Sequence, residues 1–214
     1  ILIYADGGGR HPAIQPARTK LINDLIAKGV GVGCAHYGVE VPAGDTGKTM
    51  QDWIGGYYEH KFSVNPMWAQ DFKTFPKHPI TNGVKPFKVV DEWYFNMRFR
   101  QDGVGKITPI LAAKPGKDVR DGPYVYPKGP YKHILDAQGR PETTMWAYER
   151  PNGSRGFGFT GGHKHVNWGN DNYRKVVLNG LLWLAKADIP KNGADSKVAA
   201  EELKQNLDPK GRRK

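Results

Sequence analysis

The sequence is poor in cysteine and in long apolar runs. Its 214 residues contain one cysteine, Cys34, so an intramolecular disulfide is excluded. No apolar run approaches the roughly 20 residues that cross a membrane, so we expect no membrane partner. The remaining composition, 38% hydrophobic and 25% charged residues, predicts one globular domain of ordinary size with a substantial core.

A concentrated basic region is also missing, although the formal net charge is +11. Four of the positive charges lie in a polar C-terminal tail, and without them the net charge is +7; they are Lys210, Arg212, Arg213 and Lys214. The other basic residues are scattered singly, with no basic helix or arm that could follow a nucleic-acid backbone. We therefore expect no nucleic-acid partner.

A complete phosphate-binding loop is missing as well. The segment at 42–49 ends in Gly-Lys-Thr, as a P-loop does. The pattern also requires a glycine five residues before Gly47, and Pro42 stands at that position. Nucleotide binding is therefore not expected.

The first 36 residues have the hydrophobic pattern of a strand–helix–strand unit. A short apolar run at 1–5 precedes a glycine-rich loop, helical spacing begins near Pro16 and stops at Gly29, and a second apolar run covers 30–35. Such a unit joins parallel strands. Further elements are expected as strands at 88–94, 106–113, 144–149 and 155–160, with a hairpin between the last two, and as a buried helix at 172–186.

The composition changes after Pro190, where the chain becomes polar. We expect an α/β domain at 1–190 and a polar linker or tail at 191–214, with a short helix at 197–205. The chain opens on Ile1, inside an expected strand and without a methionine. This indicates a trimmed piece of a longer protein, which leaves room for an additional domain.

Ionisable side chains stand at or just after the ends of three expected strands. They are His36, then Asp91 with Glu92, then His163 with His165. The carboxyl ends of parallel strands meet at one edge of a sheet, where α/β proteins bind ligands, so we expect these groups to lie together. Imidazoles and a carboxylate in that place can bind a divalent metal, zinc or similar. They can equally act as a general acid/base pair, and the spacing leaves both possibilities open.

Two details of this pattern depend on where the strands end. His163 and His165 share a side only if their strand continues through them. Cys34 precedes His36 by two residues, so a Cys/His nucleophile pair is an alternative. The interpretation that we favour is a small buried cysteine within the strand.

Four segments of the chain together match the sequence pattern of a known protein family. They are Gly-Val-Gly-Cys-Ala-His-Tyr at 31–37, Gly-Gly-Tyr-Tyr-Glu at 55–59, His-Pro-Ile-Thr-Asn-Gly at 78–83 leading to Asp-Glu-Trp-Tyr at 91–94, and Gly-Gly-His at 161–163 with the helix ending Leu-Asn-Gly-Leu-Leu-Trp at 178–183. In this order and spacing the chain resembles the ThuA-like, trehalose-utilisation family, over roughly residues 1–190. The fold of that family is similar to that of class I glutamine amidotransferases.

The resemblance implies a three-layer α/β sandwich with a mostly parallel sheet, of flavodoxin-like or class I glutamine amidotransferase-like type. It places His36 at the sharp turn where amidotransferases carry their nucleophilic cysteine, and His163 at their catalytic histidine. Cys34 lies two residues too early for that turn, which argues against glutaminase activity. Family members usually carry a strand, helix and strand ahead of the segment that opens this chain. Without them the sheet would be exposed, so we expect a missing N-terminal segment, a partner or a rearrangement that covers that edge.

The resemblance also implies a function, because members are associated with sugar metabolism, including trehalose and 3-keto-glycoside routes. We expect an enzyme that acts on a glycoside or keto-sugar by acid/base or metal-assisted chemistry, with His36, Glu92 and His163 as catalytic residues. The same three residues and His165 are the expected ligands of a divalent metal. The expected substrate-binding residues are Tyr37, Glu59, Asp91, Tyr94, His165 and Trp168.

Two other functions stay open. The first is a non-catalytic sugar-binding module, which aromatic residues beside polar groups would suit. The second, which we favour least, is an amidotransferase-like hydrolase that uses Cys34. A small carbohydrate is the ligand expected for the first two functions. The sequence leaves open its identity, the oligomeric state and the compartment, cytoplasmic or extracytoplasmic in a bacterium.

Overall fold

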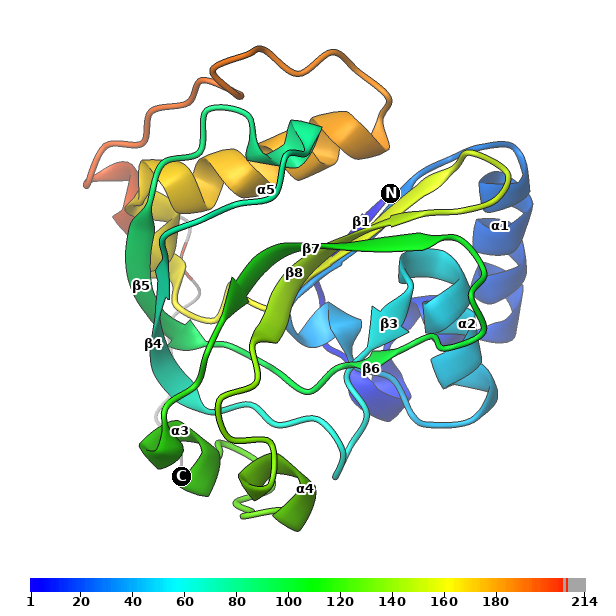
Figure 1. Cartoon of the computed structure of the whole chain (residues 1–214). Coiled ribbons are helices and arrows are strands. Elements are labelled where there is room, and N and C mark those ends of the chain that lie inside the picture. The colour runs from blue at the N-terminus through cyan, green and yellow to red at the C-terminus, as the bar shows by residue number, and fades with distance from the viewer. Residues whose placement is uncertain (206, 208–214) are drawn as a thin grey trace.

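The computed structural model describes residues 1–205 and 207, and its centre is a five-stranded sheet with the order β1-β2-β9-β8-β7 (Figure 1). These strands are β1 (Leu2–Ile3), β2 (Val32–Ala35), β7 (Lys106–Ala113), β8 (Glu142–Glu149) and β9 (Arg155–Phe159). The pairs β1–β2 and β2–β9 are parallel, whereas β8 is antiparallel to both β9 and β7. The sheet is therefore mixed, and the expectation of a mostly parallel sheet is wrong for the half that contains the β8–β9 hairpin.

The predicted strand–helix–strand unit is present as β1, α1 (Pro16–Ala27) and β2. Pro16 stands at the first helical position, where a missing backbone N–H costs nothing. Gly29 follows the helix with φ +91°, a left-handed conformation that favours glycine and ends the helix. The strands that flank α1 are parallel, with Leu2 opposite Gly33, as a crossover connection requires.

Helices cover both faces of the main sheet (Figure 1). The helix α2 (Asp45–Ile54) buries Met50 and Ile54 in the same cluster as Cys34 of β2. On the other face, α5 (Asp171–Leu184) packs on β9 and β2, and its Leu184 lies over Gly33. Consecutive residues of β2 thus contact opposite layers, as the alternation of side chains along a strand requires. The architecture is an α/β sandwich.

The strand predicted at 88–94 exists as β5 (Phe87–Glu92), but it does not belong to the main sheet. It pairs antiparallel with β4 (Met67–Phe72), in a separate two-stranded sheet. The expectation that all three sets of ionisable side chains end strands of one parallel sheet is therefore wrong for β5. A second small pair joins β3 (Gly56–Tyr57) and β6 (Arg98–Phe99).

The remaining helices are short. They are α3 (Lys117–Asp121) and α4 (Lys132–Leu135), with the 3-10 helices η1 (Gly8–Arg10), η2 (Pro12–Ile14), η3 (His36–Val39), η4 (Pro79–Thr81), η5 (His165–Gly169) and η6 (Glu202–Lys204). None of the described helices is long and apolar enough to span a membrane.

The segment after Pro190 lies against α5. The backbone N–H of Ala194 donates to the Asn179 side chain at 2.8 Å. Of the short helix expected at 197–205, the structure contains the 3-10 turn η6. The end of the expected tail, residues 206 and 208–214, lies outside the described residues, and a boundary at 190 stays a prediction.

Candidate functional site

His36 stands directly after β2 with φ +47°, a left-handed conformation that costs free energy for a residue with a side chain. Its Nδ1 lies 3.2 Å from the carbonyl oxygen of Thr160. Because a carbonyl can only accept, Nδ1 carries the proton, and Nε2 is left with a free lone pair. Burial lowers the pKa of His36, which favours this neutral form.

Glu92 is the last residue of β5, and its side chain is 5% exposed. The Asn65 amide donates to Oε1 at 2.8 Å, which fixes the carboxylate. Burial raises the pKa of Glu92 to about 7, against the opposing effect of the hydrogen bond from Asn65. A carboxyl group with this pKa can accept or release a proton near neutral pH.

His163 lies in the loop after β9, and its side chain is 49% exposed. The buried carboxylate of Asp91 accepts hydrogen bonds from the backbone N–H of Gly162 at 3.0 Å and of Lys164 at 2.9 Å, and from the Tyr173 hydroxyl at 2.7 Å. Asp91 therefore holds the backbone on both sides of His163. Its carboxylate positions this loop, and its expected role in substrate binding stays a prediction.

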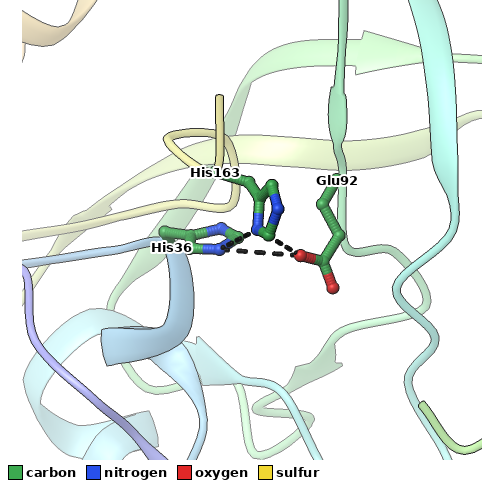
Figure 2. Close-up of side chains that lie close together, drawn as sticks. All are labelled: His36, Glu92 and His163. Atoms are coloured by element: carbon green, nitrogen blue, oxygen red, sulfur yellow. Dashed lines mark hydrogen bonds and ion pairs between the residues drawn. The ribbon is translucent and has the colours of Figure 1, made fainter. Parts of the chain in front are cut away.

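The three side chains converge, as Figure 2 shows. His163 Nδ1 is 2.6 Å from Glu92 Oε2 and 3.3 Å from His36 Nε2, and His36 Nε2 is 3.8 Å from Glu92 Oε2. Neighbouring ligand atoms of a tetrahedral zinc ion lie roughly 3.3 Å apart, since each is about 2.0–2.1 Å from the metal. The distances of His36 Nε2 from His163 Nδ1 and from Glu92 Oε2 approach that value. The shorter distance between His163 Nδ1 and Glu92 Oε2 fits a proton shared by these two atoms. Two imidazoles and a carboxylate thus fit a divalent metal such as zinc, and they also suit proton transfer.

These groups open into a pocket of about 400 Å³. We refer to His36, Glu92 and His163 as the triad. Besides the triad, the lining of the pocket comprises Asp6, Tyr37, Glu40, Asn65, Tyr94 and Tyr126. The Tyr94 hydroxyl lies 3.4 Å from His36 Nε2. Tyr37 and Tyr126 are exposed, at 38% and 67%, so their rings are available to a ligand.

Of the expected substrate-binding residues, Tyr37 and Tyr94 line this pocket, and Glu59, Asp91, His165 and Trp168 do not. The carboxylate of Glu59 is engaged elsewhere, by Arg98 at 2.7 and 2.9 Å. Trp168 packs edge-on against Tyr173.

His165 is exposed at the start of η5. Because β9 ends at Phe159, the condition under which His163 and His165 share a side is not met. The group of described residues whose ligand atoms converge contains His163 and omits His165.

Four residues of the pocket were missed by the sequence reasoning: Asp6, Glu40, Asn65 and Tyr126. Asp6 follows the first strand of the sheet. The expectation that ionisable residues after strands line a ligand site, which pointed to His36, therefore also applies to Asp6. Glu40 forms an isolated β-bridge with Tyr58, whereas Asn65 and Tyr126 lie outside the strands, and no local pattern marked these three residues.

Cys34 is completely buried within β2. Burial raises the pKa of its thiol to about 12, so a reactive thiolate is strongly disfavoured. This geometry agrees with a small core residue and argues against a nucleophile paired with His36.

Comparisons with known proteins bear on the whole domain. The family model ThuA, described as trehalose utilisation, matches residues 6–184. A crystal structure of a ThuA-like protein from Bacteroides uniformis is similar, with a TM-score of 0.57 and 15% sequence identity; the match covers 87% of this chain and 70% of that one. At this identity the likeness shows the fold alone. A comparison with curated proteins gave no match.

Proposed function

Since this chain belongs to the trehalose-utilisation (ThuA) family, we propose that it is a carbohydrate-active enzyme that acts on a glycoside or keto-sugar. The observation that carries the proposal is the convergence of His36, Glu92 and His163 on one pocket. Burial raises the pKa of Glu92 and lowers the pKa of His36, and ionisable groups with such shifted pKa values in a pocket are typical of catalytic sites.

The chemistry that suits these groups is proton transfer next to a sugar carbonyl. Glu92 has a pKa of about 7, so its carboxylate is present at neutral pH and can remove a proton from the carbon beside the carbonyl. His163 contacts Glu92 Oε2 and is half exposed, so it can pass that proton to water. An N–H of His163 directed at the developing oxyanion would stabilise it. A divalent metal held by the triad would supply Lewis-acid stabilisation at the same place.

A non-catalytic sugar-binding module is the second candidate, and one observation favours it. The rings of Tyr37 and Tyr126 are exposed where they line the pocket, and amphipathic aromatic rings suit the apolar face of a sugar. This function predicts saturable binding without product, even after long incubation.

We also propose that the fold is of flavodoxin-like or class I glutamine amidotransferase-like type. The parallel β1–α1–β2 unit and the parallel pairing of β2 with β9 support it. The left-handed conformation of His36 directly after β2 fits the sharp turn on which amidotransferases carry their nucleophile.

Turnover tests the function directly. The wild type, Glu92→Gln and His163→Ala would be incubated with trehalose and other glycosides and with their 3-keto derivatives, and products would be followed by mass spectrometry. Loss of a general acid or base is expected to slow turnover by about 10²–10⁴-fold. Glu149→Gln, an exposed carboxylate on β8, is the matched control and should retain activity. Full turnover in both triad variants would refute the proposed catalytic role.

A further inference from the structure

The pocket that holds the triad is acidic, although the protein as a whole is basic. The chain has 32 Lys and Arg against 21 Asp and Glu. The lining of the pocket contains Asp6, Glu40 and Glu92, and none of its described lining residues is Lys or Arg. Because like charges repel strongly where water is partly excluded, this lining disfavours a ligand that carries a phosphate or a carboxylate.

Glu40 differs from the rest of this lining because its side chain is partly buried and accepts no hydrogen bond from any of the described residues. Its backbone is fixed, since its N–H donates to the Tyr37 carbonyl at 3.0 Å and its carbonyl accepts from the Gly8 N–H at 2.9 Å. Within the described part of the chain, no side chain or backbone N–H bonds its carboxyl group. A partly buried polar group that faces a pocket without a protein partner is available to hydrogen-bond a ligand.

The loop that carries Asp6 packs closely against the backbone of Glu40. A side chain at Gly7 would overlap the Tyr37 carbonyl oxygen and would lie 2.9 Å from the Glu40 carbonyl oxygen, so only glycine allows this close approach. The contact brings an acid from the end of β1 next to the turn η3. Asp6, Tyr37 and Glu40 thus form one wall of the pocket, with two carboxyl groups and an exposed ring.

We propose that this wall is a recognition subsite for an uncharged polyhydroxylated sugar ring and that it excludes sugar phosphates and sugar acids from the triad. The inference rests on the proposed function and adds the substrate class. Carboxyl groups hydrogen-bond to neighbouring hydroxyls of a sugar, and the Tyr37 ring covers its apolar face. Glu40 is the residue on which the selection depends, because it is the more buried of the two acids.

The test compares each neutral sugar with a counterpart that carries one anionic group. Trehalose would be titrated against trehalose 6-phosphate, and glucose against glucuronate, by calorimetry on the whole chain at pH 8. At this pH Glu40 and Glu92, with pKa values of about 7, are mostly ionised. Wild-type protein should bind each neutral sugar at least about tenfold more tightly than its anionic counterpart. Glu40→Ala should weaken binding of the neutral sugar by about 10–100-fold. Glu40→Lys should remove the preference, and Glu149→Gln should match the wild type.

Thermal melting of each variant shows whether it is folded, and Glu40→Gln replaces Glu40→Ala if the latter is not. Equal or tighter binding of the anionic sugars by the wild type would overturn the inference, as would binding of the neutral sugars by a folded Glu40→Ala that is as tight as that of the wild type. If Glu40→Gln is used instead, an undiminished preference for the neutral sugars would overturn it. Either result would leave the proposed function standing, because turnover and its loss in Glu92→Gln are measured independently. If no sugar binds to the wild type, the proposed function fails, and the inference fails with it.

Discussion

His163 Nδ1 lies 2.6 Å from Glu92 Oε2, although the two residues come from different sheets. His163 follows β9 of the five-stranded sheet, and Glu92 ends β5 of the β4–β5 pair. The contact therefore joins the two sheets at the pocket. A proton or a divalent metal can occupy the space between these atoms, and zinc binding distinguishes the two states.

Metal binding can be measured with zinc alone. We expect chelator-treated wild-type protein to bind one Zn²⁺ per chain, and His163→Ala to bind it about 100-fold or more weakly, because one of three ligands is lost. His165→Ala is the matched control, since His165 lies two residues away and outside the convergent group. Mass spectrometry and calorimetry give the stoichiometry and the affinity. Equal losses in both variants would contradict the assignment of His163 as the ligand, and a wild type that binds no zinc would favour the proton.

Asp91 should be essential for the loop that carries His163. Asp91→Asn keeps the shape but replaces one acceptor oxygen with a donor that faces N–H or O–H groups, so we expect a loss of about 2–4 kcal/mol in the free energy of unfolding. Tyr173→Phe removes only one of the hydrogen bonds to Asp91 and should cost about 1 kcal/mol. Urea unfolding measures both. Equal effects of the two substitutions would show that the backbone hydrogen bonds of the loop contribute little.

Cys34 should be unreactive in the folded protein. Its burial and a thiol pKa of about 12 leave almost no thiolate at pH 8. Iodoacetamide should therefore modify it only after denaturation, and Cys34→Ala should retain sugar turnover. Rapid alkylation of the native protein with parallel loss of activity would revive the cysteine-dependent hydrolase.

Glu40 should make the stability of the fold depend on pH. Burial raises its pKa from the ordinary value of 4.5 to about 7, so between these pH values the folded chain holds a proton that the unfolded chain has released. Stability therefore falls as the pH rises from about 4.5 to 7 and changes little above it. Glu40→Gln cannot ionise and should be more stable than the wild type by about 1–2 kcal/mol at pH 8, with little difference at pH 4.5.

Urea unfolding across this range measures the difference between the two proteins. The charge of Glu40 also raises the pKa of Glu92, so the difference includes the loss of this repulsion, which acts in the same direction. Glu149→Gln serves as the control, since its carboxylate is exposed. A difference between Glu40→Gln and wild type that is the same at pH 4.5 and pH 8 would argue against a raised pKa.

The sequence predicted the elements whose signals are local. The strand expected at 106–113 is β7 (Lys106–Ala113), and the helix expected from Pro16 is α1, because residue alternation and turn residues act over a few positions. The helix α2 was not predicted, although Met50, Trp53 and Ile54 have helical spacing, because the Gly-Lys-Thr segment at its start resembles the end of a P-loop. The spacing of these apolar residues is sufficient to predict the buried face of α2.

By itself the sequence determined which ionisable side chains follow the predicted strands, and His36, Glu92 and His163 are among them. It could not determine that Glu92 arrives from a separate sheet, or that Glu40 and Asn65 come from elsewhere in the chain to line the same pocket. Periodicity and turn chemistry are local properties of a few neighbouring residues. Strand pairing and loop docking depend on contacts between segments far apart in the chain, and only the tertiary structure decided those.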